Sequence, residues 1–419
     1  MKVEILAVIM AGGKGSRLYP LTMTRAKPAV PFAGKYRIID FVLSNFINSE
    51  IYSIFVLTQF KAQSLLKHLR EGWSYNANVV KKHFITPIPA QMRTGENWYR
   101  GTADSIFQNL GFIQSYEPDL VAVFGADHIY RMDIRQMIDF HKEKEAHATI
   151  AALPMPIKKA KGFGIIQVDK KWRVTGFQEK PENPTPIPGQ PDMTLISTGN
   201  YIFNSKELYE QVTEDANMET DHDFGKSILP KIYQTHKIYA YNMQKNSIPK
   251  VIKSEKNDYW RDVGTIEAYF EANMELLSDA PPFDLYNYYW PIRTASFSTP
   301  PSKLVMNKST KKDIIENCLI SEGVIINGGK ITNSVIGRNV VIEEGAVVED
   351  SIILNNVHIG KNAKIKKAII DKKYRVKDDE KIGYDLEKDA ERFNVSETGI
   401  VTIPEAKGTP PLVRYIFGG

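Results

Sequence analysis

The chain has 419 residues, too many for one ordinary domain, so we expect at least two. Hydrophobic residues make up 42% of it and charged residues 25%, which is the balance of a folded globular protein. The net charge of +5 is dispersed along the chain, so it does not indicate nucleic acid as a partner. Cys318 is the only cysteine, which excludes an internal disulfide and a thiolate metal cluster. Because no apolar run approaches the roughly 18 residues of a membrane span, we expect a cytoplasmic protein without a membrane partner.

Residues 1–275 alternate short apolar runs with amphipathic helical segments, and we expect them to form one domain. The strand-like runs are 5–10, 53–59, 120–127 and 148–155, and the helical segments include 40–50 and 133–146. Apolar strands between helices are typical of a mostly parallel sheet that is covered on both faces. Ligands of such sheets bind beyond the carboxyl ends of the strands.

Residues 276–313 are rich in proline and aromatic residues and have no helical period, which predicts a linker lying against the surface. In the remaining domain, 314–419, branched apolar residues recur every six positions. They are Val335, Val341, Val347, Ile353, Ile359 and Ile365. This period favours a β-solenoid over a β-sandwich with chance spacing. Acyltransferases with this fold usually need a catalytic histidine, but we expect His358 to face solvent. The solenoid is therefore predicted to serve assembly or regulation.

The segment AGGKGSRL, residues 11–18, follows the first predicted strand. A Walker loop is excluded because Gly15 follows Lys14, and a dinucleotide fingerprint is excluded because Leu18 stands where its third glycine belongs. The remaining interpretation is a turn whose backbone amides face a nucleotide, with Arg17 and Lys27 adding positive charge beside the phosphates. The alternative is a tight turn with solvated cations.

Four later segments carry groups that suit an anionic ligand. Trp98 and Tyr99 precede a Gly-Thr-Ala-Asp turn, and Glu179 and Lys180 stand before a proline. Asp127 ends a predicted strand and Asp262 precedes a predicted helix, so the two carboxylates are candidate Mg²⁺ ligands. Each aspartate also has a structural interpretation, as a cap of the turn or helix that follows it.

Taken in order, these segments resemble a known enzyme family. The sequence AGGKGSRL, RAKPAVPFAGKYRIIDF, ENWYRGTADS, GADHIYRMD, GFQEKPENP, STGNYIF, HDFGKSILP and YWRDVGTIEAYFEANM is similar to bacterial glucose-1-phosphate adenylyltransferases, also called ADP-glucose pyrophosphorylases. The resemblance implies an α/β Rossmann-like nucleotidyltransferase domain followed by a left-handed parallel β-helix of hexapeptide repeats. It also implies the Mg²⁺-dependent reaction of ATP with α-D-glucose 1-phosphate to ADP-glucose and diphosphate, in glycogen synthesis.

The resemblance assigns a role to each candidate residue. Catalysis falls to Arg17, Lys27 and Asp127, and the metal to Asp127 and Asp262. The nucleotide site comprises Gly12, Gly13, Lys14, Gly15, Gln59, Gly101 and Thr102. The glucose-1-phosphate site comprises Tyr99, Gly164, Glu179, Lys180 and Ser197. Gln59 and Trp98 match positions that link regulatory and nucleotide sites.

The family is allosteric, and the resemblance implies an anionic metabolite effector bound by Arg25, Arg37 and Arg392. The family members activated by fructose 1,6-bisphosphate have basic residues at three positions where this chain has Thr24, Pro31 and Glu391. Because each lost charge-assisted bond to a phosphate is worth about 1.5–3 kcal/mol, we expect weak or absent activation by that effector. A homotetramer is implied by the family alone.

Two other functions are open at this stage. Uridylyl- and thymidylyltransferases share the glycine segment and the Glu-Lys-Pro segment, so UTP or dTTP is an alternative substrate. A non-catalytic regulatory subunit is the other alternative, although such paralogues usually lose the metal aspartate or the loop cations. Here Arg17, Lys27, Asp127, Lys180 and Asp262 are all present, which favours a catalytic chain.

Overall fold

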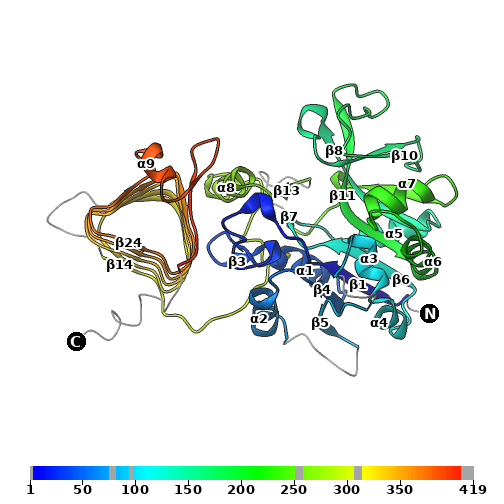
Figure 1. Cartoon of the computed structure of the whole chain (residues 1–419), viewed down its shortest axis with the longest axis horizontal. Coiled ribbons are helices and arrows are strands. Elements are labelled where there is room, and N and C mark those ends of the chain that lie inside the picture. Colours follow the sequence, from blue (N-terminus) through cyan, green and yellow to red (C-terminus); the bar gives the residue numbers. More distant parts are fainter. Residues whose placement is uncertain (1–2, 75–81, 94–97, 251–257, 306–313, 407–419) are drawn as a thin grey trace.

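A computed structural model describes all residues except 1–2, 75–81, 94–97, 251–257, 306–313 and 407–419. Figure 1 shows two parts side by side, a sheet flanked by helices and a three-sided prism of short strands seen along its axis. The ends of the predicted linker and of the predicted second domain, 306–313 and 407–419, lie outside the described residues. No helix among the described residues is long and apolar enough to cross a membrane.

The first part is built on a nine-stranded mixed sheet. Its strands are β1 (Ile5–Met10), β4 (Ser53–Thr58), β5 (Phe84–Pro89), β6 (Leu120–Gly125), β8 (Ala148–Pro156), β9 (Gly164–Val168), β10 (Val174–Glu179), β11 (Met193–Asn204) and β12 (Ile238–Asn242). The main path runs β10-β9-β11-β6-β1-β4-β5, with β8 joining β11 to β12. The strands β6, β1, β4 and β5 are parallel neighbours, as the apolar runs of the sequence predict.

Helices cover both faces of this sheet. One apolar core lies under α1 (Ile38–Asn48), α2 (Gln63–Gly72) and α5 (Ile134–Glu143). The other lies under α3 (Thr102–Phe107), α4 (Leu110–Ser115), α6 (Ser205–Ala216) and α7 (Leu229–Ile232). Outside the sheet, α8 (Ile266–Met274) follows a two-stranded ribbon of β7 (His128–Tyr130) and β13 (Trp260–Asp262), and β2 (Pro31–Phe32) pairs with β3 (Tyr36–Arg37). Thr265 caps α8, so Asp262 is not its N-cap.

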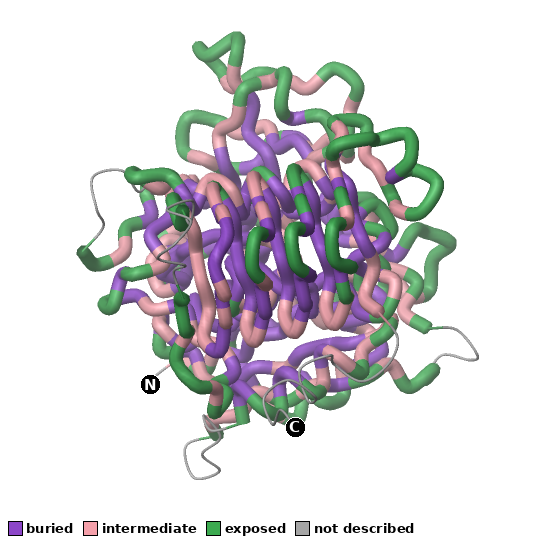
Figure 2. The backbone as a smooth tube through the Cα atoms, turned by 90° about the vertical axis from the view of Figure 1, so that its left-hand side faces the viewer, coloured by how far each residue is buried: buried purple, intermediate pink, exposed green. Residues whose placement is uncertain are grey.

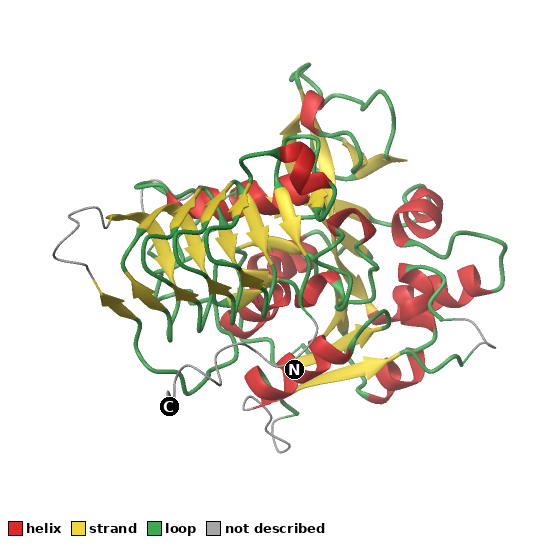
Figure 3. Cartoon of the chain, turned by 60° about the vertical axis from the view of Figure 1, so that its left-hand side comes forward, coloured by secondary structure: helices red, strands yellow, loops and turns green. Residues whose placement is uncertain are grey.

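The second part is a parallel β-helix whose strands stack in layers (Figure 3). They are β14 (Lys303–Val305), β15 (Ile314–Ile320), β16 (Ile325–Asn327), β17 (Lys330–Ile336), β18 (Val341–Ile342), β19 (Val347–Glu349), β20 (Ile352–Ile353), β21 (His358–Ile359), β22 (Lys364–Lys366), β23 (Ala368–Ile370), β24 (Arg375–Val376), β25 (Lys381–Ile382), β26 (Asn394–Val395) and β27 (Val401–Ile403), with the short helix α9 (Leu386–Ala390) outside. The predicted solenoid is therefore confirmed.

The repeat is not an unbroken period of six. Lys330 pairs with Val347, Val347 with Lys364 and Lys364 with Lys381, a step of 17 residues per coil. Buried residues recur in every coil of the prism (Figure 2). Those facing its interior include Ile336, Ile342, Val348, Ile353, Ile359 and Ile365. Three of the six residues of the sequence period, Val335, Val341 and Val347, thus stand one position before the residue that faces the interior. The reason is that one side of each coil is a residue shorter and neighbouring strand residues face opposite ways.

Left-handed backbone at the corners explains part of the repeat sequence. Gly345, Asn362 and Asp379 occupy one corner of successive coils with φ of 73°, 55° and 60°. Glycine, asparagine and aspartate are the residues that tolerate this conformation best. The Asn362 side-chain amide also donates to the Asp379 carboxylate at 3.2 Å, so these corners are bonded from coil to coil.

His358 does not face solvent, contrary to the prediction. It pairs with Val341 in one neighbouring coil and Arg375 in the next, and it is 3% exposed. Its Nε2 atom lies 3.1 Å from Oε1 of Glu343. The sequence pattern could not show this burial, because a histidine on the outer face of a strand is covered only through its neighbours in other coils.

The predicted linker is less superficial than expected. Phe283, Trp290, Ile292 and Ala295 are buried. The segment runs along α1, where the backbone amide of Arg293 donates to Ser44 Oγ. The described residues 278–305 contain no helix, in agreement with the prediction, but several apolar residues of the segment are part of the core.

Asp40 in α1 joins three segments. One carboxylate oxygen accepts from His68 Nε2 at 2.6 Å and from Trp73 Nε1 at 2.9 Å. The other accepts from the Arg37 amide at 2.8 Å and from Thr294 Oγ1 at 2.6 Å. The residue is fully buried, so this one side chain holds α1, α2 and the linker together.

A third apolar core joins the two parts. From the first part it includes Phe32, Phe41 and Tyr269. From the β-helix it includes Val335, Ile352, Leu354, Ile369 and Ile400. Because Val335, Ile352 and Ile369 are paired in successive coils, one flat face of the prism packs against the first part.

Candidate active site

A cavity of about 600 Å³ opens at the carboxyl ends of β1, β4 and β6. This is the position at which parallel sheets of this kind bind ligands. The predicted site residues among its lining are Gly12, Gly13, Gly15, Arg17, Lys27, Gln59, Tyr99, Gly101, Thr102, Asp127, Gly164, Glu179, Lys180, Ser197 and Asp262. The structure therefore brings residues from nine separated segments to one place.

The glycine segment turns sharply after β1 and leads into η1 (Ser16–Leu18). Gly15 has a φ of 62°, and a Cβ atom there would lie 2.9 Å from Cβ of Lys27. Both facts require glycine. Among the predicted nucleotide residues, Lys14 does not line the cavity.

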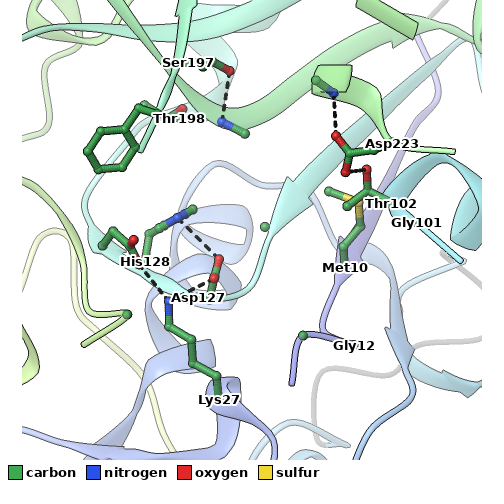
Figure 4. Close-up of a pocket in the computed structure, with 18 of the residues that line it drawn as sticks. Met10, Gly12, Lys27, Gly101, Thr102, Asp127, His128, Ser197, Thr198 and Asp223 are labelled. Carbon is green, nitrogen blue, oxygen red and sulfur yellow. Dashed lines mark hydrogen bonds and ion pairs between the residues drawn. The ribbon is translucent and has the colours of Figure 1, made fainter. Parts of the chain in front are cut away.

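Two carboxylates face one another across the cavity floor with Lys27 between them. The ammonium group of Lys27 lies 3.0 Å from Asp127 Oδ2 (Figure 4). It also lies 2.8 Å from Asp262 Oδ1. Arg17 lies farther out, 3.8 Å from Asp262. Burial alone would lower the pKa of Lys27, but the two carboxylates outweigh it and raise that pKa. Burial would raise the pKa of Asp127, but the charges of His128 and Lys27 lower it below its usual range.

These carboxylates form a site that fits a divalent cation. Ligand atoms of Asp127, His128 and Asp262 all lie within 4.8 Å of one another. Carboxylate oxygens are the ligands that Mg²⁺ prefers. Gly264 leaves room beside them, because a Cβ atom there would lie 2.9 Å from Asp262 Oδ1. This donor set would hold a divalent metal, which would supply positive charge beside phosphate groups in the cavity.

His128 and Trp260 were missing from the prediction. His128 lies opposite Asp262 in the β7–β13 ribbon, and its Nε2 atom is 3.4 Å from Asp127 Oδ1. Its ring packs against that of Trp260 at a tilt of 41°, with the centroids 4.6 Å apart. His128 Nδ1 and Trp260 Nε1 are buried without a hydrogen-bond partner among the described residues. The only sequence signal was their position beside the two aspartates.

The predicted sugar-phosphate residues also line the cavity. Lys180 Nζ lies 2.8 Å from Glu179 Oε1 at the end of β10, and the Lys180 side chain is 58% exposed. The exposure leaves this ammonium group accessible to a ligand. Gly164 faces Glu179, because a Cβ atom at residue 164 would lie 3.1 Å from Glu179 Oε2. The Tyr99 hydroxyl accepts from Asn109 at 2.8 Å, and the Tyr99 amide donates to Gln59 Oε1 at 2.6 Å.

A second group missed from the sequence is Asp223. Its carboxylate accepts from the amides of Gly225 and Lys226 and from Thr102 Oγ1 at 2.8 Å (Figure 4). Gly101 is in close contact here, since a Cβ atom would lie 2.2 Å from the carbonyl oxygen of His222. The segment HDFGK was noted in the sequence, but its aspartate had no signal beyond its place two residues before a glycine.

Of the predicted regulatory and effector residues, Gln59 lines this cavity, whereas Trp98, Arg25, Arg37 and Arg392 do not. Trp98 is 46% exposed and does not line it. Arg37 donates to Ser64, and burial together with the charges of Arg25 and Arg338 lowers its pKa to about 10, against the effect of Asp40. Arg392 pairs with Glu380 on the β-helix.

Arg25, the third predicted effector residue, is 1% exposed and already paired. Its guanidinium lies 3.0 Å from the carboxylate of Asp371 and 2.6 Å from Glu405. Glu405 also accepts from Thr24 Oγ1 at 2.9 Å and lies 3.0 Å from Lys373. We call Arg25, Asp371 and Glu405 the junction cluster.

Acid should weaken this cluster. Burial would raise the pKa of Glu405, but Arg25, Lys373 and Thr24 lower it from 4.5 to about 2. A carboxyl group with a depressed folded-state pKa stabilises the fold above its ordinary pKa and loses that contribution as the pH falls through the folded value. We expect the difference in free energy of unfolding between wild type and Glu405→Gln to be constant above about pH 5.5 and to shrink below it. Urea unfolding from pH 7 to pH 3 measures this, and a difference that does not vary with pH would contradict it.

Comparisons with known proteins agree with this geometry. Residues 6–279 match the nucleotidyl transferase family, and residues 300–403 match the GlmU-like C-terminal hexapeptide family. The chain is therefore a nucleotidyltransferase with a hexapeptide β-helix. It is 50% identical to a glucose-1-phosphate adenylyltransferase of Photobacterium profundum (96% of this chain, 98% of that protein) and 49% identical to that of Thermus thermophilus (97% and 99%). It belongs to the glucose-1-phosphate adenylyltransferase family.

Proposed function

We propose that this chain transfers an adenylyl group from ATP to α-D-glucose 1-phosphate, giving ADP-glucose and diphosphate, with Mg²⁺ as the metal. One observation carries the proposal: a single cavity joins the glycine turn, the Lys27–Asp127–Asp262 group and the Glu179–Lys180 pair. The two relatives described above are named glucose-1-phosphate adenylyltransferase, and this chain aligns with nearly their full length. The uridylyl and thymidylyl alternatives lack support from these comparisons.

The chemistry needs no side-chain nucleophile. A phosphate oxygen of glucose 1-phosphate is already anionic near neutral pH and attacks the α-phosphorus of ATP in line with the leaving diphosphate. Lys180 would hold the sugar phosphate from one side, and the glycine turn would hold the triphosphate from the other. Arg17 and Lys27 would then neutralise charge on the leaving diphosphate. The protein's main contribution is to align the two phosphates.

A metal held by Asp127 and Asp262 would supply positive charge to the phosphate oxygens when bound. Lys27 holds these two carboxylates in fixed positions, because its ammonium group contacts both of them. We propose that His128 keeps Asp127 oriented by its contact at 3.4 Å.

The two parts of the chain have different proposed functions. We propose residues 1–275 as the catalytic domain, 276–313 as the linker and 314–419 as the domain for assembly and regulation. We also propose a cytoplasmic homotetramer and an anionic metabolite effector bound near Arg37. Arg338 and Lys372 lie within electrostatic reach of Arg37 or Arg25, and burial lowers the pKa of both.

The test is diphosphate release by the purified chain with Mg²⁺ and glucose 1-phosphate. We expect a strong preference for ATP over UTP, dTTP and GTP. Equal or faster release with UTP or dTTP would assign the chain to another nucleotide. No release with any nucleotide, from folded protein, would support the regulatory-subunit alternative.

Lys180→Ala should act on the sugar phosphate alone. Losing one charge-assisted bond worth about 1.5–3 kcal/mol should raise the KM for glucose 1-phosphate by about 10- to 150-fold. The KM for ATP should stay within about twofold, because Lys180 lies across the cavity from the glycine turn. Initial rates at varied substrate measure both constants. Lys159→Ala, an exposed lysine outside the cavity, is the control and should match wild type.

A further inference from the structure

The junction cluster links the β-helix to the segment that carries Lys27. Asp371 follows β23 and Glu405 lies two residues beyond the end of β27, and these strands are parallel neighbours in which Ile370 pairs with Ile403. Both carboxylates therefore extend from the same edge of adjacent coils. They meet Arg25, which belongs to the other part of the molecule.

Arg25 and Lys27 are separated by one residue. Ala26 is extended and buried, and Lys27 begins the short helix η2 (Lys27–Ala29). A displacement of the Arg25 backbone therefore moves Lys27 directly. Lys27 in turn has little freedom, because its ammonium group contacts both Asp127 and Asp262 within 3.0 Å.

Both burial and ion pairs fix the position of Arg25. Its guanidinium is enclosed, with 1% of the side chain exposed, and it contacts the two carboxylates at 3.0 and 2.6 Å. Glu405 adds a hydrogen bond from Thr24, the preceding residue of the same segment, at 2.9 Å. Charge-assisted hydrogen bonds of this kind are about twice as strong as neutral ones. Glu405 thus holds two consecutive residues of the segment before Lys27.

We propose that Glu405, together with Asp371, is a positioning residue for the catalytic site and holds Lys27 in place through Arg25. Arg25 was expected to bind an external anion, but its guanidinium is paired with the carboxylates of Asp371 and Glu405. Arg25 is consequently not available to an effector in this protein. The kinetic part of this inference rests on the proposed adenylyl transfer, whereas the structural part does not.

The experiment compares Glu405→Ala with wild type in two measurements. In amide hydrogen exchange of the full chain, we expect faster exchange at Ala29 and Val30, whose amides bond to Ala26 and Lys27, and no change in β1. In the diphosphate assay, we expect kcat to fall by about 10- to 100-fold, since small misplacements of catalytic groups cost that much. Acetate, which can replace the missing carboxylate, should restore part of kcat, and chloride at equal ionic strength should not.

The control is Glu397→Ala, an exposed glutamate of the same domain that should leave both measurements unchanged. Exchange at residues 24–30 equal to that of wild type would overturn the proposal. Exchange that rises equally across β1 and the β-helix would also overturn it, because the role would then be general stability. If the wild type releases no diphosphate, the proposed function fails, and the exchange measurement still decides the inference.

Discussion

Replacing Asp127 with asparagine is expected to lower kcat by about a thousandfold or more. The substitution keeps the size of the side chain but removes the negative charge that faces Lys27 at 3.0 Å. It also takes one of two carboxylates from the site that fits a metal, so Mn²⁺ binding should weaken in parallel. Diphosphate release measures the first effect, and electron paramagnetic resonance of free Mn²⁺ measures the second.

The matched control is Asp139→Asn, an exposed aspartate on α5. It should show wild-type rates and wild-type Mn²⁺ binding. Retention of more than about a tenth of wild-type kcat by Asp127→Asn would remove Asp127 from the proposed catalytic group.

Replacing Asp40 with alanine should cause the largest loss of stability. The change leaves four donors without their acceptor: His68, Trp73, Thr294 and the Arg37 amide. Because Asp40 is fully buried, water cannot replace it without opening the contact between α1, α2 and the linker. We expect the free energy of unfolding to fall by about 3–5 kcal/mol, as for other broken buried charge networks.

Urea unfolding followed by circular dichroism gives this value. Asp40→Asn should lose less than Asp40→Ala, because the amide oxygen still accepts two of the four bonds. Asp139→Ala serves as the exposed control and should change stability by less than about 0.5 kcal/mol. A loss in Asp40→Ala no larger than in this control would show that the network does not stabilise the fold.

Much of the site could be predicted because its residues follow recognisable strands. The glycine turn follows the apolar run of β1, and Asp127 comes two residues after β6 ends, so their meeting at one sheet edge follows from parallel pairing. The glycine at position 15 indicated a turn with left-handed backbone, because glycine adopts this conformation readily. Asp262 was harder, since its place beside Asp127 depends on the β7–β13 ribbon. Its position before a predicted helix made it a candidate ligand, and the family resemblance supported that role.

Other features depend on contacts between distant segments. His358 is buried by neighbours 17 residues away on either side, and Arg25 is neutralised by two carboxylates almost 350 and 380 positions later. The hexapeptide period was visible, but the one-residue shortening of each coil was not, because Val and Ile stand at adjacent positions in the early coils. Local sequence patterns carry no information about such pairings.

The coil repeat has a consequence for how this family of sequences can vary. Solenoids usually tolerate gain or loss of a repeat, since each repeat contacts only its neighbours. Here one more coil before Asp371 would displace Asp371 and Glu405 along the prism by about 4.8 Å, the spacing of neighbouring strands. That distance would separate them from Arg25, which lies 3.0 and 2.6 Å away. The contact with Arg25 therefore fixes the number of coils between Val335, the first buried β-helix residue of the interface, and Asp371.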